Sequence, residues 1–178
     1  MIDGEITQQD AIDLLDRFEA VGIEVVVDGG WGVDAPLGRQ TRPDLDLDIA
    51  LPAADGSKIK ALLTEMRFEQ IPTTDTWEHN WVVQDLDLRR VDVHTYVLDN
   101  SGRSIGGVAY HAHHLTGHGI IGGRMVHCIP VDVMIEFHLG YEQDQGDFWA
   151  VLALCEAFGR QLPPELEQFH HRRETQVD

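Results

Sequence analysis

The spacing of apolar residues along the chain predicts alternating helices and strands in the first three quarters, and helices alone at the end. The predicted helices cover 6–21, 29–38, 57–65, 130–139 and 147–158, with a short last one from 163. The predicted strands cover 23–27, 45–51, 68–71, 77–84, 88–96, 120–121 and 125–129. Strands that come early and helices that dominate the end indicate an α+β or α/β fold.

Local signals refine several of these elements. Thr7 and Asp10 have the spacing of a capping box at the first helix. Asp55 is a candidate cap for the helix at 57–65, and Pro36 is expected to shorten the helix in which it lies. Residues 99–119 are rich in glycine and turn residues and predict irregular chain, while the tail 170–178 is expected to fray. The pattern favours a core domain at 1–129 with a helical subdomain at 130–178, or one single domain.

Composition narrows the class of function. The 178 residues carry a formal net charge of −18, which argues against nucleic-acid binding and is compatible with a small cationic partner or with plain solubility. No apolar run is long enough to span a membrane, and the acidic start does not resemble a secretory signal. Cys128 and Cys155 are too far apart for a paired metal motif, and free thiols favour a cytoplasmic protein.

Aspartates at alternate positions form the main chemical signal. Asp46 and Asp48 share one face of their predicted strand, where two carboxylates repel each other unless a cation lies between them. Oxygen ligands suit Mg²⁺, which commonly also binds substrate phosphates. A solvated acidic strand is the alternative, although this strand soon becomes apolar. The pair therefore predicts a metal-dependent phosphoryl-transfer site.

A third carboxylate lies in the motif Arg89-Arg90-Val91-Asp92-Val93-His94. Asp92 shares a strand face with His94, between valines that take the other face. Asp92 could complete the metal site or accept a proton from a substrate hydroxyl. Pairing with Arg89 or Arg90 is the structural alternative.

Phosphate contacts are predicted just upstream. A glycine pair after a strand and before a helix can offer backbone N–H groups to phosphate, or can simply form a tight turn. Guanidinium groups near the aspartates can bind phosphate oxygens or form surface ion pairs. The candidate nucleotide-binding residues are Gly29, Gly30, Arg39, Thr41 and Arg42.

Aromatic and polar residues elsewhere are candidates for the acceptor pocket. The predicted substrate residues are Trp31, Trp77, His94, His138, Tyr141 and Glu142. The last three could equally hold the C-terminal helices in place. The histidines at 111, 113, 114 and 118 match no zinc-ligand spacing and favour a polar loop near the substrate.

In combination, the motifs resemble the antibiotic nucleotidyltransferases, above all the lincosamide nucleotidyltransferases and the aminoglycoside 2″-adenylyltransferases. The resemblance covers about residues 5–160 and is carried by DGGWGVD at 28–34, GRQTR at 38–42, DLD at 46–48, VDVH at 91–94 and FHLGYE at 137–142. Asp44 departs from it, because these families often have histidine there.

The resemblance implies a polymerase-β-like nucleotidyltransferase core with a mixed sheet, and a small helical C-terminal part. It implies that Asp46, Asp48 and Asp92 hold Mg²⁺, that Asp92 is the base, and that the triphosphate of ATP or another NTP lies near the glycine turn. The predicted reaction moves a nucleoside monophosphate, AMP first among them, onto a hydroxyl of a lincosamide or aminoglycoside and releases pyrophosphate. A toxin-like enzyme that modifies a protein and a non-catalytic nucleotide-binding module remain alternatives, and the sequence leaves a homodimer open.

Overall fold

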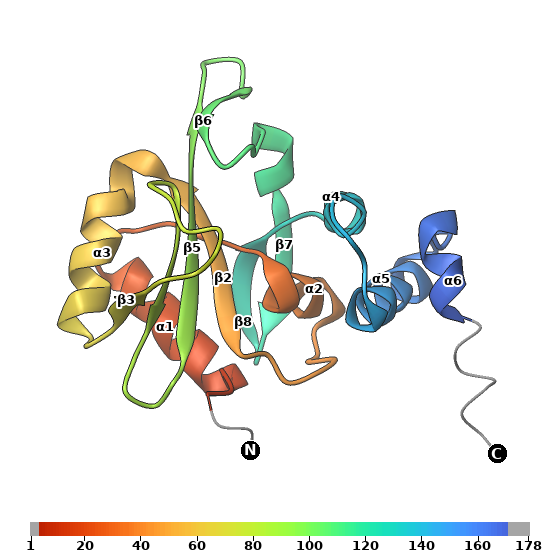
Figure 1. The fold of residues 1–178 in the computed structure, drawn as a ribbon, viewed down its shortest axis with the longest axis horizontal. Helices are drawn as coiled ribbons and strands as arrows, with labels where there is room; N and C mark the ends of the chain where they lie inside the picture. The colour runs from red at the N-terminus through yellow and green to blue at the C-terminus, as the bar shows by residue number, and fades with distance from the viewer. Residues whose placement is uncertain (1–3, 171–178) are drawn as a thin grey trace. The chain divides into compact units, whose positions relative to one another are not determined.

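A computed structural model describes residues 4–170 of the chain, which divides into two compact units (Figure 1). The units are Met1–Pro130 and Val131–Asp178. The boundary predicted between residues 129 and 130 lies one residue before this division. That the two units are separate domains stays a prediction. Within 4–170, no helix has the length and apolar character needed to cross a bilayer. The predicted frayed tail falls, from residue 171 on, outside the described residues.

The first unit contains a sheet with helices and two short 3-10 turns. Its helical elements are α1 (Gln8–Ala20), α2 (Gly29–Leu37), η1 (Ala53–Asp55), α3 (Gly56–Glu65) and η2 (Ala112–Leu115). Its strands are β1 (Val26–Val27), β2 (Asp46–Pro52), β3 (Glu69–Ile71), β4 (Asn80–Gln84), β5 (Arg90–Leu98), β6 (Ser104–Gly107), β7 (Gly117–Ile121) and β8 (Arg124–Cys128).

The strands form one mixed sheet in the order β3-β4-β5-β2-β1-β8-β7, and β6 pairs with β5 outside this path. The β2–β5 and β1–β8 pairs are parallel, while the remaining pairs are antiparallel. The parallel pairing places β2 directly beside β5, although β3 and β4 lie between them in the sequence. Two segments predicted to carry carboxylates therefore become neighbours.

The core of this unit lies on the side of the central strands that faces α1, which crosses behind them in Figure 1. Leu47 and Ile49 on β2 and Val91 and Val93 on β5 are fully buried. Each such side chain stabilises the fold by roughly 1.5–3 kcal/mol through the area that it removes from water. Because side chains alternate along a strand, burying this row turns the intervening acidic residues to the opposite face.

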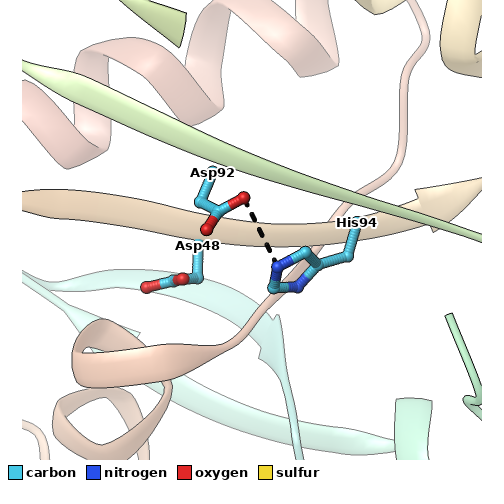
Figure 2. Close-up of side chains that lie close together, drawn as sticks. All are labelled: Asp48, Asp92 and His94. Carbon is cyan, nitrogen blue, oxygen red and sulfur yellow. Dashed lines mark ion pairs between the residues drawn. The ribbon is translucent and has the colours of Figure 1, made fainter. Parts of the chain in front are cut away.

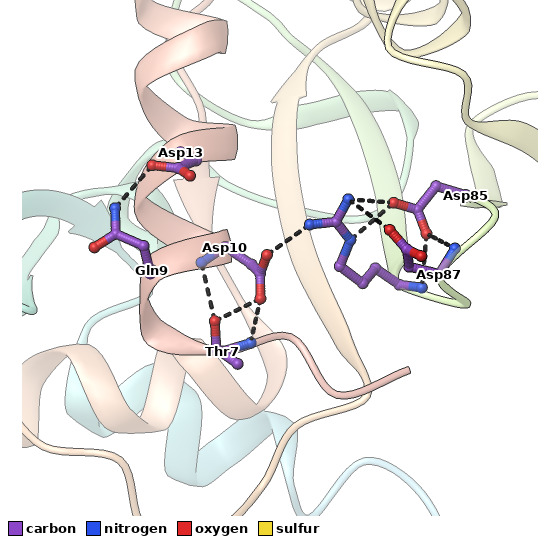
Figure 3. Close-up of polar contacts among 7 residues, drawn as sticks. Thr7, Gln9, Asp10, Asp13, Asp85 and Asp87 are labelled. Atoms are coloured by element: carbon purple, nitrogen blue, oxygen red, sulfur yellow. Dashed lines mark hydrogen bonds and ion pairs between the residues drawn. The ribbon is translucent and has the colours of Figure 1, made fainter. Parts of the chain in front are cut away.

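Helix α1 begins with the predicted capping box (Figure 3). The Thr7 hydroxyl accepts a hydrogen bond from the Asp10 backbone N–H, and the Asp10 carboxylate accepts one from the Thr7 N–H. The guanidinium of Arg89 donates to both Asp10 and Asp85, at 2.6 and 2.8 Å. It therefore ties the start of α1 to the turn between β4 and β5.

Four local predictions differ from the structure. Asp55 makes no side-chain capping hydrogen bond at α3. Strand β1 has two residues rather than five, because the chain at Ile23 folds back to bond the Phe18 carbonyl of α1. Residues 99–119 are not wholly irregular, since β6 and the start of β7 recruit them to the sheet through their backbone groups. Pro36 lies inside α2, which still extends to Leu37.

The second unit is helical, as predicted, with α4 (Val131–Phe137), α5 (Gln145–Phe158), η3 (Pro164–Leu166) and α6 (Glu167–His170). Asp144 caps α5 through a capping box with Asp147. Phe148, Val151 and Cys155 on α5 form a small core with Leu166. The two free cysteines are buried.

Candidate active site

Strand register brings the predicted aspartates together. Asp48 on β2 is the register partner of Asp92 on β5, and Asp46 lies two residues before Asp48. Since alternate residues share a face, all three carboxylates project from the sheet face opposite the buried row. The sequence prediction that Asp46 and Asp48 point the same way agrees with this geometry.

The tightest cluster of potential ligands consists of Asp48, Asp92 and His94, shown in Figure 2. One ligand atom from each lies within 4.8 Å of the others. The Nε2 atom of His94 is 3.4 Å from the Asp92 carboxylate. Asp46 is not part of this cluster, and the sequence placed His94 among the substrate residues rather than the ligands. The geometry thus joins His94 to the carboxylates.

The carboxylates are desolvated and crowd one another. Burial, followed by the charges of Asp46 and Asp28, raises the pKa of Asp48 well above its usual range. Burial and the nearby charge of Asp92 raise the pKa of Asp46. Like charges removed from water favour a bound cation, which would restore the ionised form of each.

The glycine turn at the start of α2 lies in close contact with this cluster. Asp28 is the N-cap of α2 and accepts a hydrogen bond from the Gly29 N–H at 2.8 Å. Gly29 has φ +57°, and any Cβ there would overlap the carboxylate of Asp48. A Cβ at Gly30 would overlap the carboxylate of Asp44. The glycines are needed because two acidic side chains approach their backbone closely.

The loop after α2 carries a second acidic group. The hydroxyl and backbone N–H of Thr41 both donate to Asp34, at 2.6 and 2.9 Å. Asp44 is 4% exposed and lies 3.5 Å from the exposed guanidinium of Arg42. Burial, with the charge of Asp34 next, raises the pKa of Asp44 to about 7. Arg39 is also exposed, so both arginines remain accessible to a ligand.

A buried tyrosine links the glycine turn to His94. The Tyr110 hydroxyl donates to the Asp28 carboxylate at 2.6 Å and lies 3.0 Å from Nδ1 of His94. Burial opposes protonation of His94, but the hydrogen bond and charge of Asp92 outweigh it and raise its pKa. Sequence analysis did not find Asp28 or Tyr110. The position of Asp28 directly before a helix-opening glycine was a usable capping signal, whereas Tyr110 gave none.

The predicted substrate residues have different environments. Trp31 is 2% exposed and packs in the core, and its role in substrate binding stays a prediction. Trp77 is 49% exposed and makes an edge contact with His79. His138, Tyr141 and Glu142 belong to the second unit, where the Tyr141 hydroxyl donates to Asp147.

Five further histidines form two groups that are not part of the metal-ligand cluster. His111, His113 and His114 contact one another through their rings around η2. His118 and His127 face each other across β7 and β8, beside a cavity of about 530 Å³. That cavity does not include Asp46, Asp48 or Asp92 among its lining residues. Among residues 4–170, no His, Cys, Asp or Glu cluster other than Asp48, Asp92 and His94 meets metal-ligand spacing.

The donor set fits a divalent cation. One oxygen of Asp92 is buried and makes no close hydrogen bond in the described part of the chain, where Nε2 of His94 approaches it at 3.4 Å. A long contact satisfies a buried carboxylate oxygen poorly, and a cation held by Asp48 and Asp92 would satisfy it better.

Two solved structures of antibiotic adenylyltransferases have a fold similar to that of this chain. The lincomycin-bound lincosamide antibiotic adenylyltransferase LnuA matches with a TM-score of 0.73 and 22% identity, over 84% of this chain and 97% of that chain. ANT(2″)-Ia in complex with adenylyl-2″-tobramycin matches with a TM-score of 0.69 and 16% identity, over 93% and 98%. The predicted nucleotidyltransferase fold is thereby confirmed.

The family follows from the sequence comparison. The family model "Aminoglycoside-2″-adenylyltransferase" matches residues 10–151. A lincosamide resistance protein of Staphylococcus haemolyticus is 24% identical over 161 residues, which span 85% of this chain and 96% of that protein. The chain belongs to the aminoglycoside-2″-adenylyltransferase family, and the predicted family and nucleotidyltransferase class are confirmed.

Proposed function

We propose that the protein is a Mg²⁺-dependent nucleotidyltransferase that transfers AMP from ATP to a hydroxyl of a lincosamide or aminoglycoside. The observation that carries this proposal is the register of Asp48 with Asp92 on parallel strands, with Asp46 on the same face. The printed descriptions of two structural relatives support the acceptor class: one holds lincomycin and the other adenylyl-2″-tobramycin.

In the proposed reaction the acceptor hydroxyl oxygen attacks the α-phosphorus of ATP. The new P–O bond forms as the bond to pyrophosphate breaks, and the hydroxyl proton passes to the Asp92 carboxylate. Asp46, Asp48 and Asp92 would hold the metal, which when bound would neutralise charge on the triphosphate. The cluster of half-buried carboxylates is the feature that such a cation would stabilise.

The chain's other groups position the nucleotide in this proposal. Gly29 and Gly30 open α2, where the helix dipole favours phosphate, while the Gly29 N–H itself is held by Asp28. Arg39 and Arg42 are exposed and offer guanidinium groups to the triphosphate, while Thr41 is held by Asp34. A net charge of −18 favours the approach of a cationic acceptor.

The decisive experiment incubates the protein with Mg²⁺ and each NTP against a panel of lincosamides and aminoglycosides. A drug that gains the mass of AMP, together with released pyrophosphate, is the expected result. Asp48→Asn is the matched control, because it keeps side-chain size while removing a carboxylate, and it should transfer nothing.

Two outcomes would count against the proposal. Full activity in the Asp48→Asn variant would remove the assigned site. Mass gain on a protein acceptor, with none on any drug, would favour the toxin-like alternative instead.

A further inference from the structure

The hydrogen bonds around His94 determine which of its ring nitrogens carries a proton. The hydroxyl of Tyr110 has a single hydrogen, which it donates to the carboxylate of Asp28 at 2.6 Å. A carboxylate at this distance accepts and does not donate. Toward His94, 3.0 Å away, the tyrosine oxygen is therefore left as an acceptor.

It follows that Nδ1 of His94 carries hydrogen and donates to Tyr110. Without a cation the Asp92 carboxylate favours a second proton on Nε2. A bound cation would take the place of that proton, and the neutral imidazole then offers it the lone pair of Nε2. Nε2 is the atom that lies 3.4 Å from the Asp92 carboxylate, and His94 is within ligand spacing of Asp48 and Asp92. The free lone pair is thus aimed into the carboxylate cluster.

The hydrogen bonds that run from Asp28 through Tyr110 to His94 form a relay, and neighbouring groups hold it in place. Asp28 is held by the Gly29 N–H at the start of α2, and Tyr110 is buried, with its ring against that of Tyr96. Neither group can easily reorient, so the imidazole is oriented by neighbours on two separate segments of the chain. Partners of this kind fix the tautomer of a metal-bound histidine and strengthen its binding.

We propose that Asp28 and Tyr110 are positioning residues that present Nε2 of His94 as a nitrogen ligand beside Asp48 and Asp92. A site with one imidazole and two carboxylates suits Mn²⁺, Co²⁺ or Zn²⁺ better than an all-oxygen site does. This inference rests on the metal site of the proposed function, and it predicts tighter binding of these ions than of Mg²⁺.

Tyr110→Phe tests the relay without changing charge or ring packing. We expect its affinity for Co²⁺, followed by the visible absorption of the bound ion, to fall about 10–100-fold. Tyr96→Phe is the matched control, because it removes a neighbouring hydroxyl outside the relay, and its Co²⁺ affinity should equal that of the wild type. Circular dichroism of each variant checks that the fold is retained.

Asp28→Asn tests the direction of the hydrogen bonds. The asparagine NH₂ would donate to the Tyr110 oxygen, so the hydroxyl hydrogen would turn to Nδ1 of His94 and place the ring proton on Nε2. Nitrogen-15 NMR of histidine-labelled protein, recorded at a pH high enough for the ring to be neutral, should show His94 with hydrogen on Nδ1 in the wild type and on Nε2 in the variant. This readout is independent of the charge that the substitution removes.

The inference is overturned if the wild type shows hydrogen on Nε2 alone, or if Tyr110→Phe binds Co²⁺ as tightly as the wild type. If either result is found and the protein still adenylylates a drug, the proposed function is supported and the relay is not. In the opposite result, the protein transfers no AMP, but it binds Co²⁺ through His94 and the affinity falls in Tyr110→Phe. That result supports the relay and contradicts the proposed function.

Discussion

The α-carbon of Gly29 lies so close to the carboxylate of Asp48 that a Cβ at position 29 would overlap it. Gly29→Ala should therefore displace Asp48, and it also strains a backbone at φ +57°. Gly38→Ala is a fitting comparison, since Gly38 has φ +65° and a Cβ there would meet no described residue within 4 Å beyond its chain neighbours. Both variants should lose about 1 kcal/mol of stability from strain. Loss of AMP transfer is expected in Gly29→Ala alone, and equal activity in the two would contradict this account.

Removing the Asp48 carboxylate should stabilise the metal-free protein. Burial and neighbouring acids raise the pKa of Asp48, so its ionisation favours the unfolded state as pH rises toward neutrality. Asp48→Asn should have a Tm at or above that of the wild type at pH 7 without metal. Added Mn²⁺ should raise the wild-type Tm by mass action and leave the variant nearly unchanged. Thermal melts with chelator and with metal test both points, and an equal metal shift in both proteins would sink the assignment.

Asp44 should make stability fall as pH rises. Its pKa is raised from 3.8 to about 7, chiefly by burial, so the folded state keeps a proton that the unfolded state has lost. Wild-type stability should therefore decline between about pH 4 and pH 7, and Asp44→Asn should lack this slope and gain up to about 4 kcal/mol above pH 7. Urea unfolding at several pH values measures the difference. Glu78→Gln, on the exposed surface, should follow the wild-type curve.

The Arg89 bridge should contribute to stability at neutral pH. Arg89 donates hydrogen bonds to Asp10 and Asp85. Burial alone would raise the pKa of Asp10, but the hydrogen bonds from Thr7 and Arg89 outweigh burial and lower that pKa. The contribution is therefore present above the usual pKa of a carboxyl and is lost as pH falls through the lowered value. Arg89→Gln should cost about 1–2 kcal/mol at pH 7 in urea unfolding.

Arg103→Gln is the control for that bridge. Arg103 is 76% exposed and pairs with Asp99 four residues away, so its loss should cost much less than that of Arg89. Equal costs for the two variants would show that the link between α1 and the β4–β5 turn adds nothing beyond an ordinary surface pair.

Sequence reasoning succeeded where the signal was local. The capping box of Thr7 and Asp10 is a matter of adjacent residues, and the shared face of Asp46 and Asp48 follows from the two-residue period of a strand. The third carboxylate, Asp92, was found because valines flank it. Its register with Asp48 was not predictable from spacing alone, because a parallel pair is fixed by long-range packing.

The rest of the site depends on contacts between distant segments. Tyr110 meets Asp28 across 82 positions of the chain, and the segment that carries it has the turn-rich composition of a loop. The same composition concealed β6, whose pairing with β5 uses backbone groups that a pattern of side chains does not reveal. The sequence predicts His94 as a substrate residue, whereas its closeness to Asp48 follows only from the register of β2 with β5.

The parallel pairing of β2 with β5 also has a consequence for biosynthesis. During translation β2 emerges well before β5, so one of its edges lacks a partner for a time. Charged side chains on an exposed edge discourage association with other chains. We therefore expect Asp46 and Asp48 to discourage association of the incompletely folded chain, and replacing both by asparagine should increase light scattering during refolding from urea.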